Sequence, residues 1–248
     1  MSDDREYEAI TYEVPAEGVV RIMLDRPEVA NAQNKQMLYE LNAGFDRAVA
    51  DDDIKVIILG ANGKHFSSGH DLRDRSSFDD FDTVGPVGGF SKPGDEGMMA
   101  REEEIYLGFC SRWRVLPKPT IAQVHGKVIA GGLMLVWPCD LVVASEDATF
   151  SDPVVAFGVN GVEYFAHAFE FGPRRAKELL FTGEALSAAE AKEVGMVNRV
   201  VPRDQLEAET LSLAQKIASR PSMGLKLAKM SVNQSVDAMG FPIALQSA

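Results

Sequence analysis

The 248-residue sequence lacks the features that mark several large classes of protein. It has only two cysteines, Cys110 and Cys139, which lie among apolar neighbours and at no metal-ligand spacing from a histidine. We therefore expect two buried thiols in preference to a disulfide or a metal site. No apolar run approaches the ~18 residues of a membrane span. Residues 1–6 have no apolar core and no Arg/Ser-rich pattern, so we expect no signal or transit peptide and a cytoplasmic location.

Positive charge is also scarce. The chain has 25 Lys and Arg against 37 Asp and Glu, a net charge of −12. Proteins that bind nucleic acid or an anionic membrane usually show the opposite balance, so we expect neither partner. A local cluster of cations could still hold a phosphate-bearing ligand. The apolar share of 46% is that of an ordinary globular protein with a sizeable core.

Short apolar runs alternate with helical patterns along the first two thirds of the chain. The β-branched run Ile54–Gly60 is typical of a strand that is covered on both faces. Residues 34–50 have apolar side chains at helical spacing. This alternation predicts an α/β fold with parallel strands. Further strands are expected at Val19–Leu24, Thr120–Val124 and Leu141–Ala144, and later helices at Arg174–Phe181, Ser187–Val194, Pro202–Ser219 and Ser222–Ala238.

The segment Ser76–Gly97 is rich in Gly, Pro, Asp and Phe and has no periodicity. A stretch of this length without regular structure is either a lid over a functional site or a plain surface loop. Phe78, Phe81 and Phe90 would give a lid apolar side chains to fold over a substrate. Helix is expected to resume near Met99.

Two Gly-containing turns follow two of the predicted buried strands. Ile129–Met134 comes after one strand and leads into an apolar stretch that we interpret as a buried helix, and His65–Leu72 comes after another. Small residues in such turns let a ligand approach backbone amides closely. Two such turns could direct two N–H donors at one oxygen, as in an oxyanion hole. Tight turns without any function would look the same.

The ordered set of motifs resembles the crotonase superfamily, the enoyl-CoA hydratase/isomerase group. The similarity extends over nearly the whole chain. The matching pieces are Met23–Pro27, Asn31–Ala32, Phe66–Leu72, Pro119–Ala122, Gly126, Ala130–Gly132, Cys139–Leu141, Ala144–Ser145, Asp147–Phe150, Thr182–Gly183, Ala188, Ala191 and Gly195–Pro202.

The resemblance implies a crotonase-like α/β spiral of ββα repeats over residues 1–195. It also implies a C-terminal helical region, 196–248, which makes contacts in a homotrimer or hexamer and continues past Ala248. The ligand would be an acyl-CoA thioester, with coenzyme A entering as part of the substrate, no separate cofactor and no metal. Aligned on the turns, the two oxyanion amides fall on Ser68 and Gly131.

The same alignment implies which residues line the coenzyme A path and the acyl pocket. Lys64 and Arg26 are each either a partner for the phosphates or a solvated surface cation. The residues expected to contact the substrate are Val29, Ala30, Lys64, Gly69, Asp71, Leu72, Gly132, Met134 and Val154.

The sequence departs from the family pattern at the two glutamates that hold and activate water in the hydratases. Met134 and Val154 occupy these positions, and neither side chain can move a proton. Acid–base help of this kind is worth about 100- to 10,000-fold in rate. Ordinary hydration by the standard pair is therefore not expected, and the pocket floor should be more apolar.

Three nearby residues are candidates for the missing acid–base group. Glu163 follows a shortened turn at an expected helix start, where it would otherwise only compensate the helix dipole. Asp152 precedes Pro153, and a turn-forming role is the alternative to catalysis. His70 follows Gly69 in the first turn, and the alternative is a surface histidine.

These residues support two kinds of function. The first is an acyl-CoA lyase or isomerase, in the breakdown of fatty acids or related acyl groups, that stabilises a thioester enolate. The second is a non-catalytic acyl-CoA-binding member of the family. Glu163 and the Phe-bearing segment favour the enzyme, since a binder needs neither.

Overall fold

The computed structural model describes residues 7–246. Residues 1–6, for which we expect no targeting peptide, and the last two residues lie outside the described part. Most strands form one sheet in the order β1-β2-β3-β4-β6-β9. β1 and β2 are an antiparallel hairpin, whereas all later neighbours are parallel, which confirms the predicted α/β class. The bounds are β1 Ile10–Ala16, β2 Val19–Leu24, β3 Val56–Ala61, β4 Thr120–Val124, β6 Leu141–Ser145 and β9 Arg199–Val201.

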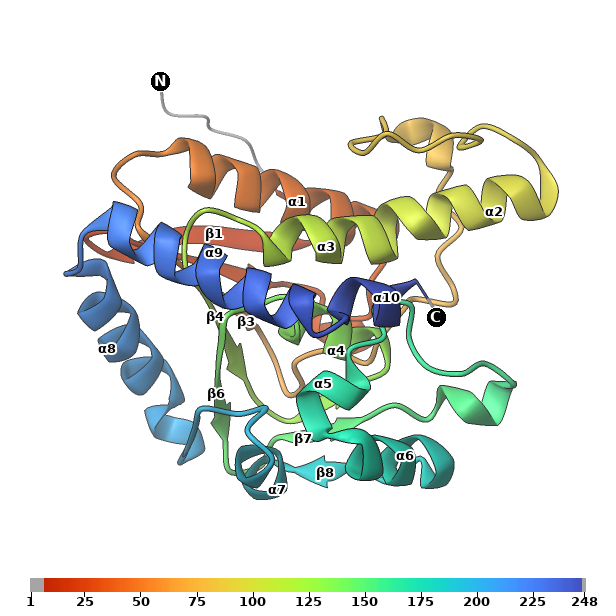
Figure 1. The fold of residues 1–248 in the computed structure, drawn as a ribbon. Coiled ribbons are helices and arrows are strands. Elements are labelled where there is room, and N and C mark those ends of the chain that lie inside the picture. Colours follow the sequence, from red (N-terminus) through yellow and green to blue (C-terminus); the bar gives the residue numbers. More distant parts are fainter. Residues whose placement is uncertain (1–6, 247–248) are drawn as a thin grey trace.

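A smaller sheet of three strands follows the order β5-β7-β8 and lies beside the main one (Figure 1). Its strands are β5 Lys127–Ile129, β7 Thr149–Ser151 and β8 Leu186–Ser187. β5 begins soon after β4 ends, so the chain passes from the large sheet into the small one at Gly126. Gly126 has φ +57°, and a side chain there would collide with the carbonyl oxygen of Lys64 at 2.4 Å. Only glycine fits this crossing.

The helices surround the two sheets. Asn34 caps α1 by accepting a hydrogen bond from Met37 N, and Ser187 and Glu190 form a capping box at the start of α7. α2 and α3 join through a π-helical turn, Glu103–Gly108, into one long rod (Figure 1). The helices are α1 Lys35–Ala50, α2 Gly94–Glu102, α3 Phe109–Arg114, α4 Gly131–Val136, α5 His167–Phe171, α6 Pro173–Thr182, α7 Ala188–Glu193, α8 Leu206–Ala218, α9 Ser222–Ala238 and α10 Phe241–Leu245.

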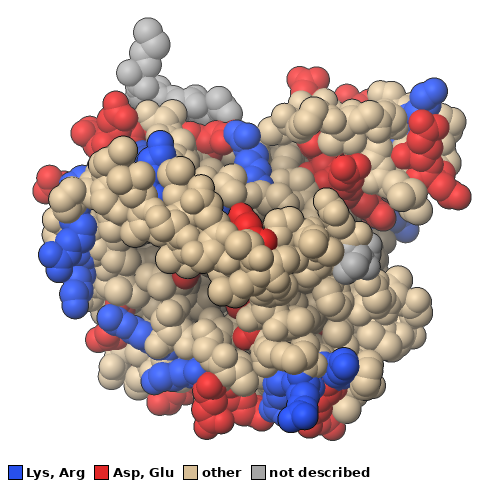
Figure 2. Space-filling view, in the orientation of Figure 1, with Lys and Arg blue, Asp and Glu red and all other residues tan. Residues whose placement is uncertain are grey.

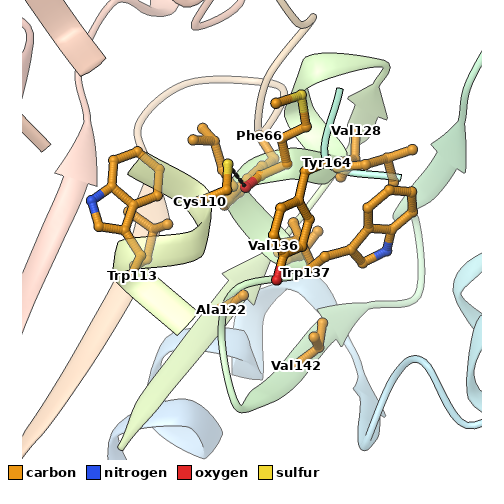
Figure 3. Packing of buried hydrophobic residues seen from close by; sticks show 14 of the residues in the cluster. Phe66, Cys110, Trp113, Ala122, Val128, Val136, Trp137, Val142 and Tyr164 are labelled. Atoms are coloured by element: carbon orange, nitrogen blue, oxygen red, sulfur yellow. Dashed lines mark hydrogen bonds between the residues drawn. The ribbon is translucent and has the colours of Figure 1, made fainter. Parts of the chain in front are cut away.

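The core lies on both faces of the main sheet. In β3, Val56 and Ile58 pack in a small cluster with residues of α8, while Ile57 and Leu59 face the main core with residues of α1. This arrangement explains why the β3 sequence is continuously apolar. The interior of the main core is filled by side chains from several elements, which Figure 3 shows around Tyr164, including Phe66, Cys110, Trp113, Val136 and Trp137.

The segment 76–97 is tied to the rod formed by α2 and α3. Glu104 is 1% exposed, and its carboxylate accepts hydrogen bonds from the backbone amides of Val84 and Gly85. α2 begins at Gly94, earlier than the expected start near Met99. The segment therefore has defined anchors at its middle and at its end.

The aromatic side chains of this segment face inward. Two cations lie near the Phe78 ring, with Lys35 Nζ 4.7 Å and the Arg101 guanidinium 5.1 Å from its centroid. Phe81 stacks on Tyr39 with 4.5 Å between the ring centroids. The segment thus packs against α1 and α2.

The C-terminal region begins within the main sheet, because β9 pairs with β6 although it lies beyond residue 195. α9 then crosses the front of the molecule (Figure 1) and has no buried residue. Ion pairs hold α9, with Arg114 bonded to Asp237 at 2.9 Å and Lys229 to Asp140 at 2.8 Å. Figure 2 shows a largely uncharged band across this face. Within residues 7–246 no helix is long and apolar enough to cross a membrane.

Candidate active site

The two predicted turns lie side by side. Ser67 donates from its amide to Lys127 O at 3.2 Å and accepts at its carbonyl from Ile129 N at 3.0 Å, which makes a parallel bridge between Ser67 and Val128. Continued by three residues, this register brings His70 alongside Gly131. Gly69 allows the close approach, since a side chain there would lie 2.8 Å from Ile129 O.

The amide of Ser68 is not available to a ligand. It donates to the carbonyl oxygen of Ala30 at 2.9 Å, and this bond joins the first turn to the Ala30–Asn31 bend. The prediction that Ser68 supplies one oxyanion donor is therefore wrong. The sequence of the turn does not show which of its amides already donates to another part of the chain.

The amides of His70 and Gly131 have no acceptor among the described residues. Gly131 is the first residue of α4, where an N–H has no partner within its own helix. Ala130, directly before it, has φ 47° and ψ −116°, a conformation that is costly for a residue with a side chain. The neighbouring residues Ala30 and Asn31 also have positive φ. Residues with strained backbone conformations therefore lie next to both amides: Ala130 precedes Gly131, and Ala30 and Asn31 contact the turn that carries His70.

The His70 side chain lies against Gly131. A Cβ atom on Gly131 would be 2.4 Å from His70 Cδ2, so the imidazole fills the space in front of the glycine. The imidazole also stacks on Tyr106, with the ring centroids 3.8 Å apart and the planes at 6°. Burial lowers the pKa of His70 to about 4, so the ring is neutral at pH 7. The alternative of a solvated surface histidine does not hold.

Glu163 is the polar group that faces His70. Its Oε2 lies 3.9 Å from His70 Nε2, and that nitrogen has no hydrogen-bond partner in the described part of the chain. Burial raises the pKa of Glu163 to about 7. Glu163 does not begin a helix, because α5 starts only at His167. The dipole-compensating alternative therefore fails, and a carboxyl group poised to exchange a proton near neutral pH remains.

Asp152 has a structural role instead of the predicted catalytic one. The side chain is 0% exposed, and its Oδ2 lies 2.8 Å from His167 Nε2 and accepts from Val162 N at 3.1 Å. These bonds fix the loop that carries Glu163. His167 was not predicted as part of the site, and no spacing signal in the irregular loop between the two residues could have paired them.

The two positions that lack glutamate differ in their surroundings. Met134 is 1% exposed and belongs to the main core, and Cys110 Sγ lies 3.2 Å from its carbonyl oxygen (Figure 3). The prediction that Met134 contacts substrate is therefore not supported, since it has almost no free surface. Val154 begins a 3-10 turn, Val154–Phe157, and is only partly buried, so it remains able to line a pocket.

The remaining residues predicted to contact substrate occupy the rim of the two turns. Val29 is 39% and Leu72 is 82% exposed, and Lys64 is exposed as well. Asp71 forms an ion pair with Arg26 at 3.0 Å. Two others have roles in the backbone structure. The carbonyl oxygen of Ala30 accepts a hydrogen bond from Ser68 N, and Gly132 is buried where a side chain would lie 2.8 Å from Ser67 O.

A cavity of about 320 Å³ opens next to the paired turns. Tyr106 and Gln33 form the wall on the side of His70 and Gly131, while Phe78 and Arg101 belong to the covering segment and its rod. The cavity is lined by Gln33, Lys35, Leu38, Asp71, Asp74, Ser76, Phe78, Met98, Arg101, Glu102, Ile105 and Tyr106. Within residues 7–246 no three His, Cys, Asp or Glu side chains gather as a metal site would require.

Comparison with known proteins shows the family to which the chain belongs. The family profile described as enoyl-CoA hydratase/isomerase matches residues 15–85 and 92–244. A putative enoyl-CoA hydratase, EchA13, of Mycobacterium tuberculosis is 49% identical over 97% of this chain and 78% of its own length. The crystal structure of a probable enoyl-CoA hydratase from Mycobacterium thermoresistibile is 51% identical and superposes with a TM-score of 0.87, covering 96% of this chain and 92% of that one.

A more distant structure shares the same architecture. An enoyl-CoA hydratase/isomerase from Xanthobacter autotrophicus is 36% identical, with a TM-score of 0.85 over 98% of this chain and 85% of that one. The profile match and these likenesses span nearly the whole described fold. The chain therefore belongs to the enoyl-CoA hydratase/isomerase family of the crotonase superfamily.

Proposed function

We propose that the protein converts an acyl-CoA thioester through an enolate, with the amides of His70 and Gly131 as the oxyanion hole and Glu163 as the base. The proposal is supported by the register of the two turns, in which His70 lies alongside Gly131 and neither amide has an acceptor within residues 7–246. Donors at a developing oxyanion typically contribute about 100- to 1000-fold each in rate.

Glu163 supplies the proton chemistry in this scheme. Its carboxylate removes a proton from the carbon next to the thioester carbonyl, and the electron pair moves onto the oxygen that the two amides bind. Return of the proton at another carbon of the conjugated system gives an isomer. Loss of a leaving group from the β-carbon instead gives an unsaturated product, the reaction of a lyase. Neither route needs a metal or a redox cofactor.

The raised pKa of Glu163 supports this role, since a base works best when its pKa lies near the working pH. His70 is neutral, with its Nε2 atom 3.9 Å from the carboxyl group, so it adds no positive charge that would lower the pKa of Glu163. Met134 and Val154 leave no second carboxylate at the usual water-binding positions.

A panel of acyl-CoA thioesters, analysed by product mass and by deuterium exchange next to the carbonyl, tests the proposal. We expect exchange, together with an isomerised or eliminated product, for at least one substrate. Turnover of crotonyl-CoA at ordinary hydratase rates would show that the missing glutamates do not matter. Binding across the panel without exchange would instead favour the non-catalytic acyl-CoA-binding alternative.

We also propose that the chain forms a homotrimer or hexamer through its C-terminal helices. α9 has no buried residue and exposes the apolar side chains of Met223, Leu227 and Met230, which share one side of the helix at i, i+4 and i+7. An exposed apolar stripe of this kind is typical of an interaction surface. Sedimentation equilibrium should give three or six chains per particle, and a monomer at micromolar concentration would contradict the proposal.

A further inference from the structure

Tyr106 is a residue to which neither the sequence motifs nor the proposed acid–base chemistry assigns a role. Its ring lies parallel to the His70 imidazole, with 3.8 Å between the centroids. The Cδ2 and Nε2 atoms of the imidazole lie against Gly131, where they occupy the space that a side chain would need. A ring that is stacked on one aromatic face and packed against a glycine has little freedom to change its rotamer.

The backbone that carries Tyr106 is unusual. Residues Glu103–Gly108 form a π-helical turn within the rod of α2 and α3. Such turns insert into α-helices rarely and occur often at functional sites, because they redirect a side chain relative to the regular helix. Here the turn lies where the rod passes the oxyanion turns, and Tyr106 reaches His70 from it.

We propose that Tyr106 is a positioning residue, whose ring clamps the His70 imidazole against Gly131 and thereby fixes both the Nε2 atom that faces Glu163 and the backbone amide of His70. The inference rests on the proposed function for its catalytic consequence. The clamp itself stands on the stacking geometry and on the π-helical turn.

The clamp acts on a crowded group of ionisable residues. Tyr106 stacks on His70, Glu163 lies 3.9 Å from His70 Nε2, and Asp152 contributes a more distant negative charge. The negative charge of Glu102 adds to burial in raising the pKa of Glu163. Tyr106 also lines the neighbouring cavity while its ring covers His70. Without the ring, more water would reach the imidazole, which is 19% exposed, and would favour its protonated form.

The experiment compares Tyr106→Phe, which keeps the stacked ring, with Tyr106→Leu, which removes it. Long-range ¹H–¹⁵N spectra of the full-length protein follow the titration of His70, whose signal is assigned by its loss in His70→Gln. In Tyr106→Leu we expect the His70 pKa to rise from about 4 toward the ordinary value of about 6.5. We also expect kcat to fall about 10- to 100-fold, while KM changes far less, because a misplaced group costs rate more than affinity.

Tyr106→Phe should retain both the low pKa and most of kcat, since its ring can still stack. Tyr39→Leu is the matched control: it removes a tyrosine that stacks on Phe81 away from the site, so it should leave the His70 pKa unchanged. Should Tyr106→Leu fail to fold, Tyr106→Met takes its place, because it removes the ring and keeps the apolar volume.

Two results would overturn the clamp: an unchanged His70 pKa in Tyr106→Leu, or equal losses in Tyr106→Phe and Tyr106→Leu, which would assign the effect to the hydroxyl group. Failure of the proposed function looks different. In that case the His70 pKa responds to loss of the ring as stated, but the wild-type protein turns over no acyl-CoA thioester.

Discussion

Asp152 and His167 form a hydrogen-bonded pair that is closed off from solvent, with 2.8 Å between Oδ2 and Nε2 and neither side chain exposed. Asp152 also accepts from Val162 N, next to Glu163 in the chain. The pair therefore holds the loop that presents the proposed base.

Asp152→Ala should lower the free energy of unfolding by about 2 to 5 kcal/mol, since it strands the buried partners of the carboxylate. Chemical denaturation measures this loss. His167→Ala should cost a similar amount, and the double variant should cost less than the sum of the two, because each removes the same interaction. An Asp152→Ala protein with wild-type stability and no activity would instead return Asp152 to a direct catalytic role.

Gly131→Ala should reduce turnover at least ~100-fold, because the new methyl group would occupy the position of the His70 ring and disturb an oxyanion donor. Steady-state rates with the best substrate of the panel measure the effect. Gly224→Ala in α9 is the matched control: no atom lies within 4 Å of its Cβ position, so activity should persist and stability should rise by about 0.5 to 1 kcal/mol. Equal activity of the two variants would contradict the account of Gly131.

The two substituted glutamate positions should respond differently when the acid is restored. Met134→Glu places a carboxyl group in the core and should destabilise the fold by about 3 to 5 kcal/mol. Val154→Glu lies on a partly buried turn and should cost about 1 kcal/mol or less. Thermal unfolding of both variants provides the comparison. Similar melting temperatures would mean that Met134 faces the pocket after all.

Stability should depend on pH through His70. Its folded pKa of about 4 lies below the ordinary value of 6.5, so the unfolded chain takes up the proton first and the fold loses stability as pH falls through this range. His70→Gln removes this pH-dependent loss of stability, because glutamine does not take up a proton. Relative to wild type it should gain stability between pH 6.5 and pH 4, by up to about 3 kcal/mol at pH 4. Urea unfolding across this range measures the gain, and a constant difference between the two proteins would exclude a depressed pKa.

Most of the fold could be predicted from the sequence, because its pattern is local. The apolar run of β3, the spacing in α1 and the helix that follows Ser187 each depend on neighbouring residues, and the structure confirms them. The predicted strands at Val19–Leu24 and Thr120–Val124 agree with β2 and β4 to the residue.

The details of the site could not be predicted in the same way. Whether the first turn offers Ser68 or His70 depends on a bond to Ala30, a residue distant in the sequence. Tyr106 reaches His70 only because the helix locally adopts a π-helical turn, which no composition pattern indicates. The pairing of Asp152 with His167 likewise depends on the path of an irregular loop.

The central claim is that Glu163 is the base beside an oxyanion hole made by His70 and Gly131, and the pH dependence of kcat/KM in wild type and Glu163→Gln tests it most directly. Glu163 acts in its ionised form, so wild-type kcat/KM should fall about tenfold per pH unit below about 7 and level off above it. In Glu163→Gln, kcat/KM should be about 100- to 10,000-fold lower, and its fall below about pH 7 should disappear. Glu193 is an exposed carboxylate on α7, so Glu193→Gln should keep the wild-type kcat/KM and its fall below about pH 7. A Glu163→Gln protein with wild-type turnover and the same fall would contradict the claim.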